Sequence, residues 1–558
     1  MHKRLVTLFV ALALVATACG GDDDNGGEAG QATPTTAAEP TRGGTLVVAL
    51  ESDPGNLNPA VTSNGAVHNA AEPMFNGLVG LDNEGRPTPE LAESWRIEGG
   101  GAQYVFTLRD GVRWHDGRPF TADDVKFSFE KALLPLHART RASLGSAQPT
   151  IETPDPRTVV FRFAQPYAPL LQQLNVTEAP IIPRHVYEGC ADLATVPGCP
   201  ANNTPVGTGP FKLTSYTNQE IRLARNPDYF RPGLPYLDEL VQRVIPDRGT
   251  QVTALKAGEV DWLWTTPGPE LAGLRTDRNV GLTDVARGPG GGNCVLTLAF
   301  NLRPPADRPP ILTDLRVRQA IAAGVNRQQA ADQILFGQGQ VAPKPIHSAL
   351  TVAAAPGLNL PNFDLARSRQ LLDQAGWRLE GGQTRVARGV QGVPDGTELT
   401  IDMDHFTGQQ ADYAQALRGQ LREVGVNVVP KQMDNPTLSK TVFADRAFDT
   451  AIISYCNEAD PQIGVRRQYH SSQISSTAFS NGAGYSNPEM DRLWDQSTTE
   501  TVQERRTPIF RQIQELAVRD LPYWWLAETE NTRAHNAACT GFNFQNTGLF
   551  AEGASCRT

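Results

Sequence analysis

The sequence predicts an α/β protein made of two or three packed units, and three observations lead to this class. The chain has 558 residues, which is more than one hydrophobic core usually organises. Residues 399–429 contain a strand, a helix and a second strand in close succession, as in a βαβ unit with parallel strands. Hydrophobic residues make up 40% of the chain and charged residues 20%, a balance that excludes a disordered protein.

The first eighteen residues have the pattern of a secretory signal peptide. A cationic start, Met1 to Arg4, precedes an apolar run from Leu5 to Ala18 that is too short for a permanent membrane anchor. The alternative, a buried N-terminal helix, is disfavoured because the Gly-, Asp-, Thr- and Pro-containing stretch that follows offers nothing to pack against it. We therefore expect export, with residues 1–18 removed.

Residues 19–42 are expected to form an anchored and flexible tether. The four residues up to Cys19, Ala-Thr-Ala-Cys, resemble a bacterial lipobox, in which the cysteine is lipidated, although alanine stands where leucine is usual. After Cys19 no aliphatic side chain in this stretch is larger than alanine, so the stretch cannot form a core. A lipid on Cys19 would hold the protein at the outer face of the cytoplasmic membrane.

The seven cysteines agree with an oxidising location. If Cys19 is lipidated, six remain, which is an even number. No Cys-x-x-Cys pair occurs, and the spacings do not indicate a zinc site. Short separation along the chain favours two disulfide bonds, Cys190 with Cys199 and Cys539 with Cys556. The two remaining cysteines, Cys294 and Cys456, form either a third bond or buried free thiols.

The elements of the N-terminal half follow from local patterns. Residues 44–50 form an apolar run bounded by glycine and by an Asp-Pro-Gly turn, which predicts a buried strand. Thr121 is expected to cap a helix with Asp124 three residues later, before an apolar stripe that starts at Val125. Residues 158–163 alternate as in a strand.

The C-terminal half contains the clearest supersecondary unit. Residues 399–403 alternate with period two, a helix with a leucine and valine stripe follows, and Gly425 ends it before a strand over residues 426–429. These elements predict a right-handed βαβ unit.

A further predicted strand, residues 448–455, ends at a polar segment that carries two carboxylates. Ligands of open parallel sheets bind just beyond the carboxyl ends of the strands. Glu458, Asp460 and the ring of Tyr455 therefore stand where a ligand site is expected.

The sequence contains no standard catalytic or cofactor-binding pattern. None of the nine histidines is followed by Glu and no Gly-Lys pair exists, which excludes the His-Glu-x-x-His motif and the P-loop. His115 lies among turn residues, which indicates a loop histidine rather than a general base. A pI near 5.5, with no Lys/Arg run longer than two, excludes a nucleic-acid binder. We predict no catalytic residue, no metal site and no cofactor, which favours a receptor over an enzyme.

A series of segments along the chain forms a signature. The strongest part is residues 89–125, with Pro-Glu-Leu-Ala-Glu-Ser-Trp at its start and Asp-Gly-Val-Arg-Trp-His-Asp-Gly before the capped helix. Similar segments follow at 207–212, 225–229, 255–261, 314–321, 366–377, 485–491 and 520–522. In this order they resemble solute-binding protein family 5, the extracellular substrate-binding lipoproteins of peptide- and nickel-type ABC importers.

The resemblance implies a two-lobed clamp like the periplasmic binding proteins of type II, with an extra subdomain inserted in lobe one. The chain would cross between the lobes near Cys294 and near Asp520. The signature at 89–125 would then be mainly scaffold, because it falls in the insert. The expected parts are lobe one (43–75, 205–293 and 521–558), the insert (76–204) and lobe two (294–520).

The resemblance also implies capture of oligopeptides or dipeptides in the interlobe cleft. A peptide is a zwitterion, so a site that accepts many sequences should hold its termini and main chain. The family places an amine-binding acidic residue near Glu458 and Asp460, without deciding between them, and its members often carry tryptophan at the position of Tyr455. Arg466 and Arg467 are near in sequence and are candidates for the ligand carboxylate.

Three more residues are candidates for the cleft. Trp262 and Trp264 alternate with Leu263 and point to one side of a strand, either into the cleft or into the core. Asn301 follows the presumed hinge.

The expected partners are the solute, a membrane through the lipid anchor, and the permease subunits, with ATP hydrolysed by a separate chain. We expect the protein to act as a monomer and to bind no nucleic acid. Two alternatives stay open: the solute is a nickel chelate or another small molecule, or the chain is an exported hydrolase.

Overall fold

The computed structural model describes most of the chain from Pro40 onward. Residues from Thr41 to the C-terminus form one compact unit. The expected signal peptide, Cys19 and the tether as far as residue 39 lie outside the described residues. Within the described part, no helix combines the length and the apolarity that a membrane crossing requires. The described residues are 40–82, 85–144, 147–284, 293–529, 532–542, 544–545, 548–549 and 551–557.

Lobe one is built on a seven-stranded sheet with the order β12-β21-β11-β1-β10-β9-β8. The predicted strand after the tether is confirmed as β1, which lies parallel to both β10 and β11, with Val48 opposite Gln242 and Trp262. Its apolar run fits this central place, because neighbouring elements cover both faces of a parallel strand. The elements are β1 (Thr45–Leu50), α1 (Gly65–Ala71), β8 (Phe211–Tyr216), β9 (Glu220–Arg225), β10 (Glu239–Val244), α6 (Arg248–Lys256), β11 (Trp262–Leu263), α7 (Leu271–Leu274), β12 (Val280–Asp284), β21 (Thr532–Asn536), β22 (Cys539–Thr540), β23 (Phe544–Gln545), β24 (Gly548–Leu549) and β25 (Ser555–Cys556).

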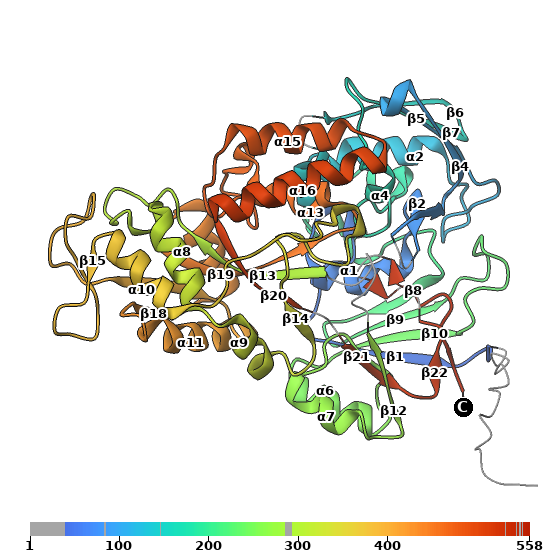
Figure 1. The fold of residues 1–558 in the computed structure, drawn as a ribbon. Coiled ribbons are helices and arrows are strands. Elements are labelled where there is room, and N and C mark those ends of the chain that lie inside the picture. The colour runs from blue at the N-terminus through green and yellow to red at the C-terminus, as the bar shows by residue number, and fades with distance from the viewer. Residues whose placement is uncertain are drawn as a thin grey trace, which may run out of the picture. The chain divides into compact units, whose positions relative to one another are not determined.

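The insert carries a four-stranded sheet with the order β4-β5-β7-β6, seen at the upper right of Figure 1. The predicted capping box is confirmed, since the Thr121 amide donates to Asp124 Oδ2 at 2.9 Å at the start of α2. The predicted alternating strand is confirmed as β7. The elements are β2 (Val79–Leu81), β3 (Pro87–Pro89), β4 (Ala92–Glu98), β5 (Gln103–Leu108), α2 (Ala122–Phe127), α3 (Ala138–Leu144), β6 (Thr150–Asp155), β7 (Thr158–Arg162), α4 (Leu170–Gln173) and α5 (Arg184–Tyr187).

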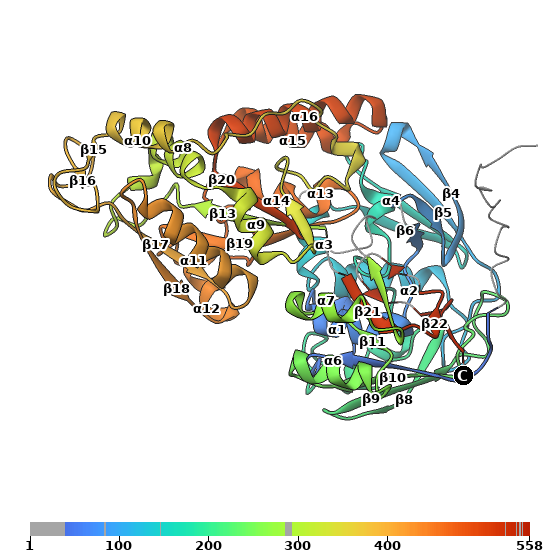
Figure 2. The same ribbon diagram turned by 60° about the horizontal axis from the view of Figure 1, so that its bottom comes forward.

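Lobe two is built on a six-stranded sheet with the order β14-β20-β13-β19-β17-β18. The predicted βαβ unit is confirmed, because β17 and β18 are parallel and α11 connects them. Helices α15 and α16 lie side by side at the top of Figures 1 and 2. The elements are β13 (Asn293–Phe300), α8 (Leu315–Gly324), α9 (Arg327–Ile334), β14 (Gly339–Val341), α10 (Leu365–Gln374), β15 (Trp377–Arg378), β16 (Val386–Ala387), β17 (Thr400–His405), α11 (Gln409–Arg422), β18 (Asn427–Gln432), α12 (Asn435–Ser439), β19 (Thr450–Asn457), α13 (Pro461–Gly464), α14 (Arg466–Tyr469), α15 (Pro488–Thr499), α16 (Gln503–Asp520) and β20 (Tyr523–Thr529).

The second passage between the two large sheets differs from the expected one near Asp520. Helix α16 ends at Leu521, whose φ of 46° reverses the chain into β20. Strand β20 pairs with β13 in the sheet of lobe two, with Trp524 opposite Leu298. The chain therefore reaches the sheet of lobe one only at β21, and residues 523–529 belong to lobe two.

Three disulfide bonds lie in the described part of the chain. One closes the loop after α5, and a second joins β22 to β25 near the C-terminus. The third links directly opposite residues of β13 and β19, at the end of the sheet of lobe two where β19 finishes. The bonded pairs are Cys190–Cys199, Cys539–Cys556 and Cys294–Cys456.

Candidate functional site

A cavity of about 500 Å³ lies where the insert meets lobe two. The insert contributes α3, which lies beside α13 and α14 of lobe two (Figure 2). Lobe two contributes the end of β19, one arginine of α14 and the loop before α15. The lining residues are Ser63, Ala138, Arg139, Ala142, Ser454, Cys456, Glu458, Arg467, Gln473, Thr477, Ala478, Phe479 and Ser480.

Strand β19 presents alternate residues to this cavity. Ser454 and Cys456 line it, whereas Tyr455 between them is fully buried on the opposite face, as the period of two requires. The Tyr455 hydroxyl donates to the Ser480 carbonyl at 3.0 Å, and its ring meets Tyr523 edge-on at 5.7 Å. Tyr455 is therefore a core residue of lobe two in this structure, and it does not lie where it could stack on a ligand in the cavity.

The two candidate carboxylates have different surroundings. Glu458 lines the cavity, and its Oε1 lies 3.7 Å from Arg139 Nη1 across the lobe boundary. Asp460 is buried away from the cavity lining, where both of its oxygens accept from Arg506, at 2.5 and 3.0 Å. Asp460 also caps α13 by accepting from the Gln462 amide at 2.9 Å. The structure thus brings only Glu458 to the cavity.

The two tryptophans pack inside lobe one. Trp262 is fully buried and stacks on His535 at 5.8 Å, with Phe542 at 4.5 Å. Trp264 lies under the Arg533 guanidinium at 4.6 Å. Neither lines the cavity, so in this structure the core alternative holds for both.

Asn301 lies at the far end of the sheet of lobe two. It follows Phe300, which pairs with Thr450 at the start of β19, roughly 20 Å from Cys456 along the strand. Its Nδ2 donates to the carbonyls of Arg446 and Phe448, both at 2.8 Å. Asn301 therefore joins two loops of lobe two and does not approach the cavity.

The sequence patterns did not single out Arg139, which lines the cavity, or Glu178, which lies beside Arg139 outside the lining. Arg139 donates from Nη2 to the Thr177 carbonyl at 3.1 Å, and its Nε lies 3.2 Å from Glu178 Oε1. Burial raises the pKa of Glu178 to about 7, against the opposing effect of Arg139. Burial works against the charged form of Arg139, but Glu178 and Glu458 together raise its pKa above the usual value. No local periodicity marks these residues, because their contacts join distant parts of the chain.

Arg467 supplies a second guanidinium to the cavity. Its Nε donates to the Gly464 carbonyl at 3.1 Å. Burial lowers the pKa of Arg467, and the nearby Glu458 opposes that shift. The cavity therefore places a carboxylate and two cations from both sides of the lobe boundary around one space, which suits a zwitterionic or anionic ligand.

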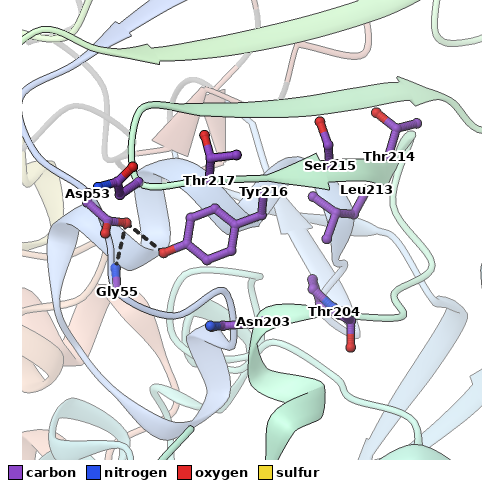
Figure 3. Close-up of a pocket in the computed structure, with 11 residues that line it drawn as sticks. Asp53, Gly55, Asn203, Thr204, Leu213, Thr214, Ser215, Tyr216 and Thr217 are labelled. Atoms are coloured by element: carbon purple, nitrogen blue, oxygen red, sulfur yellow. Dashed lines mark hydrogen bonds between the residues drawn. The ribbon is translucent and has the colours of Figure 1, made fainter.

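A larger cavity, about 650 Å³, lies beside β8 of lobe one, where the end of the insert adjoins it (Figure 3). Among the described residues that line this cavity, the charged side chain is that of Asp53. Its carboxylate accepts hydrogen bonds from the Tyr216 hydroxyl at 2.6 Å and from the Gly55 amide at 3.0 Å. Lobe two contributes none of the residues that line it. We therefore take the smaller interlobe cavity as the candidate site, because charged groups from separate parts of the fold converge there.

Comparison with known proteins places the chain in a family. The sequence profile of the bacterial extracellular solute-binding proteins, family 5, matches residues 86–476. The oligopeptide-binding protein AppA of Bacillus subtilis is 25% identical over 549 residues, covering 97% of this chain and 95% of the relative. Protein XP55 of Streptomyces lividans is 28% identical, covering 95% of this chain and 90% of its own.

Solved structures share the fold. The structure of Bacillus subtilis AppA in complex with a nonapeptide superposes with a TM-score of 0.76 at 22% identity, covering 93% of this chain and all of that one (100%). Campylobacter jejuni NikZ in complex with Ni(L-His) gives a TM-score of 0.75 at 22% identity, covering 90% and 96%. The match of the profile over most of the chain, together with this shared two-lobed fold, shows that the chain belongs to the bacterial extracellular solute-binding proteins of family 5.

Proposed function

We propose that the protein is the extracytoplasmic binding component of an ABC importer and that it captures peptides in the interlobe cavity. Relatives over nearly the whole length are named as an oligopeptide-binding protein and as putative ABC transporter peptide-binding proteins. The observation that carries the proposal is the pair of opposite charges, Glu458 and Arg467, in the lining of one cavity beside the end of β19.

This pair suits the two ends of a peptide. The ligand ammonium would lie against Glu458 and an anionic group against Arg467, because charge-assisted hydrogen bonds are stronger than neutral ones. Ser454, Gln473 and Thr477 add small polar side chains that can hydrogen-bond a peptide main chain or hold water. These lining residues would bind the termini and the main chain, which all peptides have in common, and would contact the peptide side chains only loosely.

Binding should favour closure, because the lining comes from the insert on one side and lobe two on the other. A ligand that contacts both sides binds the closed form more tightly than the open form, and only that difference shifts the equilibrium. The closed, loaded form would then dock on the permease, with ATP hydrolysed by a separate chain and the peptide released unaltered.

The N-terminus supports an exported and anchored protein. In the proposal residues 1–18 are a signal peptide, Cys19 is lipidated, and the following residues tether a monomeric body to the outer face of the cytoplasmic membrane. Mass spectrometry of the mature protein, showing a diacylated Cys19 as its first residue, would support this part. An intact Met1 in the mature protein would contradict it.

Native mass spectrometry of the purified protein tests the function directly. We expect co-purified peptides to be released on denaturation, and calorimetry with a peptide library to give heat without any new product. The absence of bound peptide together with the absence of heat would overturn the proposal. Shortened peptides after incubation would favour a hydrolase, and heat with nickel–histidine alone would favour a chelate receptor.

A further inference from the structure

The interlobe cavity carries more positive than negative charge in its lining. Among the described residues that line it, the ionisable side chains are Arg139, Arg467 and Glu458. Two guanidinium groups therefore face one carboxylate. Because charges buried at a binding site are weakly screened, this imbalance affects which ligands bind.

Arg139 is held at a fixed place between two carboxylates. It stands in the first turn of α3, donates to the Thr177 carbonyl at 3.1 Å, and lies 3.2 Å from Glu178 and 3.7 Å from Glu458. The carboxylate of the insert, Glu178, lies behind it and outside the lining, and the carboxylate of lobe two, Glu458, lies beside the cavity. A ligand cation that approaches Glu458 therefore meets Arg139 next to it.

The carboxylate behind Arg139 compensates its charge only in part. Glu178 is fully buried, and neither of its oxygens has a hydrogen-bond partner among the described residues. The Nε of Arg139 likewise has none there, so this pair is held by charge without hydrogen-bond geometry. Burial also favours the protonated form of Glu178 near neutral pH, because its pKa is raised to about 7.

Arg467 has no carboxylate at ion-pair distance in the described part of the chain. Its guanidinium donates to the Gly464 carbonyl through Nε, and the residue is part of the cavity lining. A partly buried guanidinium of this kind gains from an anionic group of the ligand, because charge-assisted hydrogen bonds are strong.

Building on the proposed function, we propose that Arg139 is a specificity-determining residue that turns the cavity toward peptides with an additional carboxylate, such as aspartyl or glutamyl peptides. Arg139 lies 3.7 Å from Glu458 and competes with the ligand ammonium for that carboxylate, which weakens binding of the ammonium. Arg139 and Arg467 together attract an anionic side chain. Peptides that carry a lysine in the same place meet like charge and bind more weakly.

The test is calorimetry with alanine peptides of two to five residues in which one residue is replaced by Glu, Gln or Lys. Wild-type protein should bind the Glu peptide about tenfold more tightly than the isosteric Gln peptide. Arg139→Gln should bring this ratio to about one and strengthen binding of the Lys peptide. Arg139→Lys keeps the cation and should keep the ratio, as should Arg141→Gln, whose side chain is exposed on the same helix.

The outcomes separate the inference from the function on which it rests. If wild-type protein binds Glu and Gln peptides equally, or if Arg139→Gln keeps the preference, the inference is wrong and the proposed function stands. If wild-type protein binds none of these peptides, both fail. Should Arg139→Gln not fold, Glu178→Gln replaces it in calorimetry at about pH 8.5, above the raised pKa of Glu178, where its carboxylate is charged. Loss of this charge behind Arg139 should raise the Glu-to-Gln ratio, and an unchanged or lower ratio contradicts the inference.

Discussion

At the scale of single residues, two carboxylates two positions apart in the chain have separate surroundings. Glu458 faces the interlobe cavity, and Asp460 is buried against Arg506 at the start of α13. Helix α13 begins directly after Asp460, which is its N-cap. The Asp460 carboxylate accepts from the Gln462 amide and from Arg506, and it is not part of the cavity lining. The amine-binding role is therefore proposed for Glu458 alone.

Glu458→Gln should weaken binding of peptides with a free amine by about tenfold to hundredfold, because a charged hydrogen bond becomes a neutral one. Some loss of folding stability should accompany it, because Glu458 is buried and lies 3.7 Å from Arg139, which keeps Glu178 as its second carboxylate. Calorimetry with free and N-acetylated forms of one peptide measures the effect. If both forms lose affinity equally, Glu458 does not bind the amine.

Asp460→Asn should act on folding instead. Removing one charge of a buried ion pair leaves Arg506 uncompensated, which costs about 3–5 kcal/mol in the free energy of unfolding. Urea unfolding should show this loss, while peptide affinity below the transition stays near that of the wild type. A selective loss of affinity at unchanged stability would return Asp460 to the list of amine ligands.

The buried Glu178 predicts a dependence of stability on pH. Burial raises its pKa from 4.5 to about 7 on folding, Glu458 and Glu72 add to the rise, and Arg139 and Arg467 oppose it. The folded state therefore holds a proton that the unfolded state has lost between pH 4.5 and 7, and this contribution to stability falls as the pH rises through that window.

Glu178→Gln removes this titration. The free energy of unfolding of the variant relative to wild type should increase from pH 4.5 to pH 7, by at most about 3 kcal/mol. Urea unfolding at a series of pH values measures the difference. Glu130, whose side chain is exposed and pairs with Lys126, provides the control. Glu130→Gln should leave the pH dependence of the free energy of unfolding unchanged. A difference that is flat with pH would show that folding does not raise the pKa of Glu178.

At the scale of elements, β19 divides its residues between the cavity and the core. Ser454 and Cys456 face the cavity, and Tyr455 packs in the core of lobe two. The disulfide with Cys294 joins β13 to β19 at this end of the sheet. The strand thus presents a small side chain and a disulfide to the ligand space, which leaves room for a ligand beside its main chain.

Neighbouring substitutions on β19 should therefore have opposite effects. Ser454→Leu places a branched side chain in the cavity and should abolish peptide binding while the protein stays folded. Tyr455→Phe removes the hydrogen bond to Ser480, which should cost about 1 kcal/mol of stability without changing affinity. Calorimetry and thermal unfolding of both variants provide the measurements. A loss of affinity on Tyr455→Phe at unchanged stability would mean that the Tyr455 hydroxyl contacts the ligand.

At the scale of the whole molecule, the chain passes twice between the two large sheets, between β12 and β13 and between β20 and β21. The two large sheets have separate hydrophobic cores, and we expect the lobes to rotate as bodies while each keeps its own core. The ion pair of Arg139 with Glu458 lies across the lobe boundary and is one of the contacts that rotation would change.

Peptide binding should reduce the radius of gyration measured by small-angle scattering. To move the lobes from 1% to 99% closed, a ligand must bind the closed form better by about 5.5 kcal/mol. The Ser454→Leu variant is the matched control and should show no change on addition of the same peptide. A radius of gyration that stays constant while calorimetry reports binding would contradict closure by rotation of the lobes.

The sequence predicts correctly those elements whose signals are local: the strand before Asp53, the capped helix at Thr121, and the βαβ unit around α11. Apolar periodicity and capping depend on neighbours a few residues away, so they can be read along the chain. The resemblance to the family predicts the two lobes and the insert. It also predicts that the chain crosses between the lobes near Asp520, whereas β20 still belongs to the sheet of lobe two and the crossing follows Thr529.

Which polar residues meet depends on how the chain folds in three dimensions. Arg139 and Glu458 come from distant parts of the chain, and no spacing in the sequence links them. The same holds for Arg506, which takes Asp460 out of the site, and for Tyr523, whose contact keeps Tyr455 in the core. A binding site depends on such convergence, because its charges act through distance in space, whereas a sequence pattern records only distance along the chain.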